Sequence, residues 1–209
     1  ELTEARDIRR ATSSSQSKTS GLNPLTSTGI PDIGNTKEGT QTTTTANTAV
    51  KGQITSSQGG ITISGGDASV AIQGVDLAAQ GNLAIRGGGV SITGATNTTT
   101  TTTERSSKGA AISAEPLKGA AEGWGAKKNG TSTTTQSELV RTELSGAKIQ
   151  LQAKKEDGTL GNVVLAGTTL TTPGTLSVQA DKLLLATQQT TTSTSSQEEK
   201  RDLLWENMR

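Results

Sequence analysis

Residues 70–93 read VAIQGVDLAAQGNLAIRGGGVSIT, and their pattern is the basis for predicting the fold. The stretch contains short motifs in which two apolar residues are separated by one other residue, such as Val70-x-Ile72 and Leu83-x-Ile85. Alternation with a period of two is typical of a strand with one buried face. The motifs are separated by Gly-rich breaks and recur after roughly 20 residues, which indicates short strands stacked one coil apart.

The same pattern returns without a gap at residues 163–186, which read VVLAGTTLTTPGTLSVQADKLLLA. Apolar residues or glycines agree at nine positions of the two stretches. The flanking segments also match, apart from a loop-like insertion at residues 154–158. The chain is therefore predicted to hold two repeat units of roughly 90 residues and the tail of a third.

The composition excludes several classes of function. Among 209 residues there is no His, Cys, Phe or Tyr, and there are two Trp. The absence of Cys excludes disulfides and thiolate sites, and the absence of His removes the usual base near neutral pH. With 20 Lys and Arg against 19 Asp and Glu, the net charge of +1 argues against a strongly basic nucleic-acid binder. No apolar run is long enough for a membrane-spanning helix, and the start at Glu1 lacks a signal peptide, as in an excised fragment.

Thr, Ser and Gly together make up about two fifths of the chain. This suits either a disordered linker or a β-solenoid with a narrow aliphatic core. The register of the apolar positions favours the solenoid. The predicted fold is all-β: a right-handed parallel β-helix with projecting Thr-rich β-arms. Its inward-facing residues are expected to be Val70, Ile72, Leu83, Ile85, Val90, Ile92, Val163, Leu165, Leu176, Val178, Leu183 and Leu185.

The arms are predicted from runs of Thr, which favours strands. Residues 98–103 should pair antiparallel with residues 131–135, with a mobile tip at 107–129. Residues 13–15 and 42–45 should form the equivalent arm with its tip at 16–41. Flexible linkers are the alternative interpretation. An isolated two-stranded ribbon is marginal in water, so the arms need support from the coil edge or from one another.

The expected organisation has five parts. Residues 1–38 are the end of a preceding repeat plus a linker, 39–106 are repeat unit one, 107–129 are the mobile linker or arm tip, and 130–196 are repeat unit two. Residues 197–209 carry Leu203, Leu204, Trp205 and Met208 at near-helical spacing, which predicts a short amphipathic helix. A frayed terminus is the alternative for this last segment.

No catalytic, cofactor-binding or metal-binding residue is assigned. Asp67 and Asp76 have no acidic counterparts in the second unit, so no carboxylate pair for acid-base work on a glycan is expected. The Gly65-Gly66-Asp67 word of calcium-binding rolls occurs once, and Gly87-Gly88-Gly89 lacks the Lys of a phosphate loop. Asn97 and Asn129 are nominal glycosylation acceptors. The pair Lys127-Lys128 near Trp124 could contact an anionic surface or could be merely solvated.

Residues 71–77, 81–85 and 90–97, together with the Thr runs and the Trp that follows each, resemble the haemagglutinin repeats of two-partner-secreted exoproteins. That family includes filamentous haemagglutinin and the contact-dependent growth-inhibition effectors. The resemblance covers almost the whole chain. The second unit departs from it at residues 181–182 and in the 154–158 insertion.

This resemblance implies a non-enzymatic stalk segment of a large bacterial exoprotein, secreted or displayed at the cell surface and associated with the outer membrane. The segment would extend and present a toxin or an adhesive region. The implied partners are an outer-membrane two-partner transporter during export and components of a target-cell envelope, with no nucleic acid and no cofactor. Two alternatives remain: a carbohydrate-active β-helix enzyme, and a phage or adhesin fibre segment, which would usually trimerise.

Overall fold

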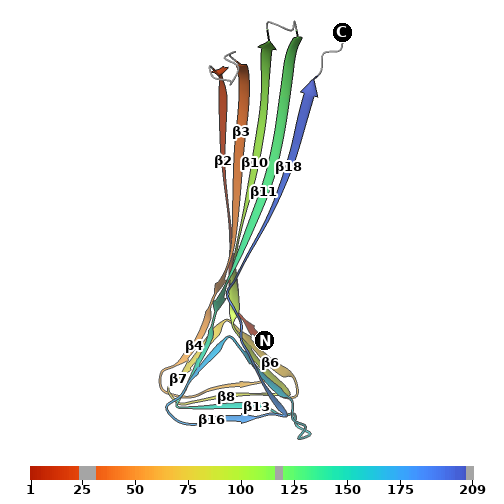
Figure 1. Cartoon of the computed structure of the whole chain (residues 1–209). Coiled ribbons are helices and arrows are strands. Elements are labelled where there is room, and N and C mark those ends of the chain that lie inside the picture. The colour runs from red at the N-terminus through yellow and green to blue at the C-terminus, as the bar shows by residue number, and fades with distance from the viewer. Residues whose placement is uncertain (24–31, 116–119, 206–209) are drawn as a thin grey trace. The chain divides into compact units, whose positions relative to one another are not determined.

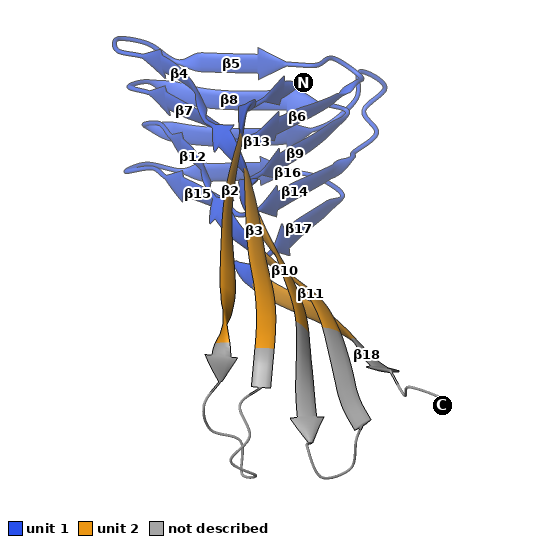
Figure 2. Cartoon of the chain, turned by 90° about the horizontal axis from the view of Figure 1, so that it is seen from above, with its two compact units in different colours: residues 1–9, 46–99, 136–191 blue, residues 10–45, 100–135, 192–209 orange. Residues whose placement is uncertain are grey.

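A computed structural model of the chain describes residues 1–23, 32–115 and 120–205, with side chains at 1–21, 34–109 and 127–200. Every described element is a β-strand, so the predicted all-β class is confirmed. The residues fall into two compact units, each assembled from three separate segments (Figure 2). Unit 1 comprises residues 1–9, 46–99 and 136–191, and unit 2 comprises 10–45, 100–135 and 192–209. Each long arm strand therefore begins or ends in a segment of unit 1.

Three parallel sheets build unit 1 (Figure 1). The first contains, in order, β1 (Leu2–Thr3), β6 (Ser69–Gln73), β9 (Gly89–Thr93), β14 (Asn162–Ala166) and β17 (Lys182–Ala186). The second contains β15 (Thr168–Thr171), β12 (Thr142–Ser145), β7 (Val75–Ala79) and β4 (Gly52–Ser56). The third contains β16 (Leu176–Gln179), β13 (Lys148–Ala153), β8 (Asn82–Gly87) and β5 (Ile61–Ser64). The chain visits the second, third and first sheets in turn, and we call the result the coil stack.

Parallel pairing places equivalent residues of successive coils in register. Ile85 lies opposite both Ile63 and Leu151, and Val90 lies opposite both Val70 and Val163. Inward positions thus form ladders of aliphatic side chains, and burial of such side chains is the main stabilising contribution. All six inward-facing residues predicted for the first sequence repeat are buried, as are Val163 and Leu165 of the second repeat. The two stretches matched in the sequence lie in the same sheets two coils apart.

The prediction of buried residues is wrong for the last coil. Leu176, Leu183 and Leu185 are 43%, 47% and 73% exposed, while Val178 is partly buried against the core. Their register is as expected, because Leu176 pairs with Ile149 and Leu183 with Val163. They are exposed because β16 and β17 are the end strands of their sheets, and no described strand covers their outer side.

The connections that lead from the first sheet to the second are of two kinds, and this explains the repeat of roughly 90 residues. Gly74 and Gly167 make two tight corners with φ of 61° and 60°, a backbone region that suits Gly. After β1, β9 and β17 there is no such tight corner, and the chain continues into the long strands β2 (Ala5–Asn23), β10 (Ala95–Glu115) and β18 (Thr191–Trp205). One period of roughly 90 residues is therefore two coils plus one excursion into the arms.

The arm sheet consists of five long strands with β18 at one edge and β2 at the other, in the order β18-β11-β10-β3-β2 (Figure 1). Their bounds are β2 (Ala5–Asn23), β3 (Asp32–Val50), β10 (Ala95–Glu115), β11 (Ala120–Val140) and β18 (Thr191–Trp205). Thr100 Oγ1 lies 3.4 Å from Thr135 Oγ1, and Thr102 Oγ1 lies 3.4 Å from Thr133 Oγ1. The predicted antiparallel pairing of residues 98–103 with 131–135 is confirmed.

The two hairpins also pair with each other through β3 and β10, where Thr44 Oγ1 is 3.4 Å from Thr101 Oγ1. The two hairpins therefore support each other. Such support is needed because an isolated two-stranded ribbon is only marginally stable in water.

The arm strands are longer than predicted. Residues 107–115 and 120–129, expected in one arm tip, belong to β10 and β11, and most of residues 16–41, expected in the other tip, lie in β2 and β3. The mobility expected of residues 107–129 stays a prediction. The tips at 24–31 and 116–119 lie outside the described residues. The C-terminal segment forms β18 up to Trp205 and not a helix, because β11 offers it a paired edge that a short amphipathic helix lacks. Residues 206–209 are outside the described residues.

Candidate functional site

The two aspartates singled out in the sequence connect coils to each other. Asp76 Oδ1 accepts a hydrogen bond from Glu143 N at 2.9 Å, and its Oδ2 lies 2.7 Å from Lys51 Nζ. Asp67 Oδ1 accepts from Glu156 N at 2.7 Å, in the inserted loop. Each carboxylate already has a backbone partner, and the structure does not bring the two together. Their arrangement is that of structural bonds between coils.

The Gly-rich words lie at tight corners of the coil stack. Gly66 has φ of 59° in a turn closed by Ala68 N donating to Gly65 O at 3.1 Å. A methyl group on Gly88 would lie 2.0 Å from Asp67 O, so a side chain there cannot fit without backbone movement. These glycines are explained by the close approach of stacked corners.

Residues 154–158, predicted as an insertion, form a closed loop between β13 and β14. Lys155 N donates to Thr159 O at 2.9 Å, and Gly158 has φ of 87°. Asp157 Oδ1 accepts from Thr159 N at 2.8 Å. The hydrogen bonds from Thr159, with a smaller effect of Lys155, lower the pKa of Asp157 below its ordinary value of 3.8. The carboxylate holds a turn and faces solvent.

Glu4 is a buried carboxylate that sequence reasoning missed. Its side chain is 4% exposed, and Oε1 lies 2.6 Å from Arg6 Nη2. Arg6 also donates from Nη1 to Thr96 O at 2.7 Å, which ties the start of β2 to the start of β10. Glu4 Oε2 is without a hydrogen-bond partner among the described residues. The Glu-x-Arg spacing, which in an extended chain places both side chains on one face, was the available signal.

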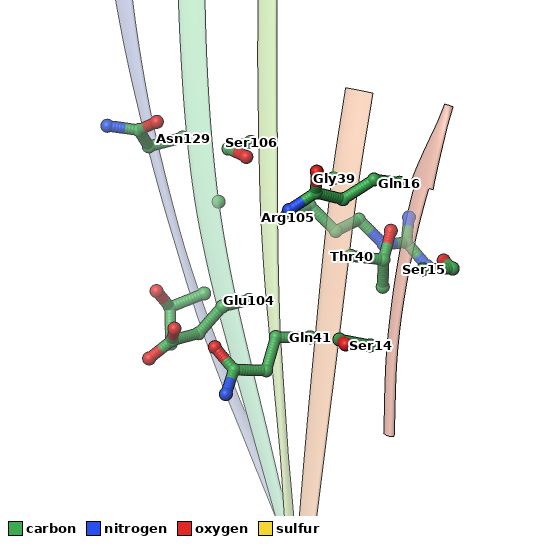
Figure 3. A pocket seen from close by; sticks show the side chains of 12 residues that line it. Ser14, Ser15, Gln16, Gly39, Thr40, Gln41, Glu104, Arg105, Ser106 and Asn129 are labelled. Carbon is green, nitrogen blue, oxygen red and sulfur yellow. The ribbon is translucent and has the colours of Figure 1, made fainter. Parts of the chain in front are cut away.

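A polar groove of about 300 Å³ lies on the arm sheet, within unit 2 (Figure 3). It is lined by Ser14, Ser15, Gln16, Gly39, Thr40, Gln41, Glu104, Arg105, Ser106, Asn129, Gly130 and Thr131, from β2, β3, β10 and β11. Gly39 makes the hollow, because it places no side chain between Gln16 and Ser106 on its neighbours. The face offers amide and hydroxyl groups, which hydrogen-bond to polar ligands.

A second groove of about 660 Å³ also belongs to the arm sheet. Thr40, Arg105, Gly130 and Glu198 contribute to it, and Gly130 again leaves space in its row. The charges along this groove have mixed sign, with Glu38 and Lys128 also among its lining residues. A surface of mixed sign attracts neither polyanions nor polycations strongly.

Of the nominal glycosylation positions, Asn97 Oδ1 accepts a hydrogen bond from Ala49 N at 2.8 Å and is half-buried, whereas Asn129 lines both grooves. Lys127 and Lys128 are exposed, and the side chain of Trp124 is outside the described set.

Groups of three or more His, Cys, Asp or Glu that could hold a metal ion do not occur in the described part of the chain. Over the same residues, no helix with the length and apolarity to cross a bilayer is present.

Comparison with known proteins gives one match. The family model described as "Hemagglutinin repeat" matches residues 33–202, most of the chain. No curated protein and no solved structure matches. The match spans the four coils described from β4 to β17, the β10–β11 hairpin and nearly all of β3, but not β2, so it covers the coil stack and much of the arm sheet.

Proposed function

Because this chain belongs to the haemagglutinin-repeat family, we propose that it is a non-enzymatic structural segment of a secreted or surface-associated, adhesin-like bacterial exoprotein. Its task is mechanical: it supplies length and stiffness between other parts of the protein. The proposal extends to presentation of a toxin or an adhesive region in contact-dependent growth inhibition or adhesion. It also includes export through an outer-membrane two-partner transporter and contact with a target-cell envelope.

The observation that carries this proposal is the continuity of the core from coil to coil. Ile61, Leu83, Ile149 and Leu176 lie in one parallel ladder across four coils. In such a stack each coil is stabilised by its neighbours, so the segment resists bending and lengthens by whole coils. The proposal takes the coil stack to be a right-handed parallel β-helix, since crossovers between parallel strands are right-handed in about 98% of cases.

The chemistry of the described residues supports a structural role. Asp67 and Asp76 each accept a hydrogen bond from a backbone N–H group of a neighbouring coil. A glycosidase needs two carboxylates flanking its substrate. The groove of about 660 Å³ on the arm sheet is lined by side chains of mixed charge.

A deletion of one structural period tests the mechanical role. Gly74 and Gly167 occupy equivalent tight corners, so removing residues 75–167 joins Gly74 to Thr168 and recreates a native corner. We expect this shortened protein to be displayed by the producing bacterium, to resist protease, and to adhere or inhibit less well because it reaches less far.

The matched control removes residues 75–147. It joins the first sheet directly to β13 and omits the second sheet from that coil, so we expect loss of folding and display. Full adhesion or inhibition by the shorter, well-displayed protein would contradict a role in reach. A displayed but inactive Asp67→Asn or Asp76→Asn variant would instead indicate a chemical site.

A further inference from the structure

Four lysines of the arm sheet lie in one row across four adjacent strands. Each is exposed. We call them the lysine row: Lys18 of β2, Lys37 of β3, Lys108 of β10 and Lys127 of β11.

The register of the two central strands follows from close contacts on both sides of the row. A methyl group on Gly39 would lie 3.1 Å from Ser106 Oγ, and one on Gly109 would lie 3.7 Å from Thr36 Oγ1. Lys37 and Lys108 fall between these two facing pairs, so they lie opposite each other.

The outer lysines follow from the same kind of evidence. Gln16 Cγ is 4.0 Å from a methyl group on Gly39, which places Lys18 of β2 opposite Lys37. On the other side, Thr102 Oγ1 lies 3.4 Å from Thr133 Oγ1 on the antiparallel neighbour. Six residues further toward the arm tip on each strand, that register places Lys108 opposite Lys127.

All four side chains share one face, because alternate residues of a strand point to the same side. With strands about 4.8 Å apart, the row is a line of four positive charges about 14 Å long. Like charges directly opposite each other in a sheet are destabilising. Ion pairs between described residues involve Arg6, Arg9 and Lys51, and none includes a lysine of the row. The row thus has an intrinsic cost that an anionic partner would remove.

The polar groove lies beside the row on the same face. Gln16, Gly39, Ser106 and Asn129 form the adjacent row of the sheet, and Ser14 and Gln41 come next (Figure 3). Glu104 and Thr131 complete that second row, so the one acidic side chain of the groove lies two rows from the lysines. The face therefore combines a line of cations with a hollow lined by amides and hydroxyls.

We propose that this face binds a linear acidic polysaccharide with one carboxylate per sugar, a polyuronate. The carboxylates lie along the lysine row, and sugar hydroxyls exchange hydrogen bonds with the amides and hydroxyls of the groove. An ammonium group is a compact charge with three donors, suited to carboxylates that approach from a flexible chain.

Two other polyanions fit less well. Single-stranded nucleic acids bind to sheets through aromatic platforms on which bases stack, and the described side chains of this face include no aromatic ring. An anionic membrane surface would favour apolar side chains beside the cations, whereas the groove is lined by polar groups.

The test measures binding of the 209-residue chain to alginate, with neutral dextran as the reference polymer. The central variant is Lys37→Gln with Lys108→Gln. Its matched control is Lys128→Gln, which alters the neighbour of Lys127 on the opposite face. Each exposed ion pair contributes up to about a fivefold change in affinity. Because the double variant loses two such pairs, we expect it to bind alginate about tenfold more weakly. The control should bind as the unaltered chain does, and added salt should weaken binding of both.

Thermal unfolding separates binding from folding. Because the substitutions relieve repulsion, the melting temperature of the double variant should equal or exceed that of the unaltered chain. If this variant does not fold, Lys18→Gln with Lys127→Gln takes its place with the same expectation. The proposal is overturned if the unaltered chain does not bind alginate, if Lys128→Gln weakens binding equally, or if the row is needed for anionic vesicles or single-stranded RNA but not for alginate.

Discussion

Thr142 is the most informative position for a stability measurement, because its hydroxyl bridges two corners of the coil stack. The side chain is fully buried. Its Oγ1 donates to Thr93 O at 2.6 Å and accepts from Gly74 N at 2.9 Å. It thus joins a tight corner to the end of β9, where the chain departs into the arm sheet.

Replacing Thr142 by Val keeps the shape of the side chain and removes both hydrogen bonds. Each contributes about 1 kcal/mol net, which sums to roughly 2 kcal/mol. Gly74 N also donates to Thr93 O at 3.2 Å, so neither backbone group loses every partner, and the larger penalty for orphaned groups does not apply. For a chain of this size the melting temperature should fall by about 4–8 °C.

The assay is urea unfolding of the purified chain followed by circular dichroism, with Thr142→Ser and Thr168→Val as companions. Serine keeps the hydroxyl and should recover most of the loss. Thr168 lies opposite Thr142 in the neighbouring coil but is half-buried, so its Val variant should lose less. A loss by Thr142→Ser as large as that by Thr142→Val would refute the role of the hydroxyl and point to packing of the methyl group.

Three further predictions concern the coil stack. Ile85→Ala should lower the free energy of unfolding in urea by about 2–5 kcal/mol, since Ile85 is fully buried. Leu184→Ala should lower it much less, because Leu184 is 47% exposed. Equal losses would contradict the assigned core. Gly88→Ala should increase amide exchange at the corners around residues 67 and 88, because its methyl group would overlap Asp67 O, and unchanged exchange would show that the corner yields without cost. The lowered pKa of Asp157 means that its contribution to the turn is complete above about pH 4 and is lost as the pH falls through the folded-state pKa. The protection factor of the Thr159 amide, which compares its exchange rate with the intrinsic rate at the same pH, should therefore fall over that window in the unaltered chain and stay constant in Asp157→Asn.

Local patterns predicted the coil stack because its determinants lie close together in the sequence. The motifs around Val70 and Leu83 alternate with the period of a strand, and their recurrence gave both the stacking and the equivalence of residues 70–93 with 163–186. The Thr runs likewise predicted antiparallel arms, since β-branched residues favour paired strands.

Burial in the last coil was not predictable from these patterns. Leu185 carries the same signal as Ile92, yet one is 73% exposed and the other fully buried. A side chain is buried only if another strand lies over it, and this depends on where the described stack ends. The helix predicted from the spacing of Leu203 and Leu204 is absent for a similar reason. Pairing of β18 with β11 outweighs the local preference of this segment for a helix.

The class of the fold, the period and the identity of most core residues are predictable from the amino-acid sequence, because they depend on alternation and repetition along the chain. The order of the strands in the arm sheet, and hence the single row of lysines at positions 18, 37, 108 and 127, becomes apparent only in the folded chain. No spacing in the sequence relates these four residues. They come together because hydrogen-bonded register between strands sets which side chains face each other, and that register is fixed by contacts between distant segments.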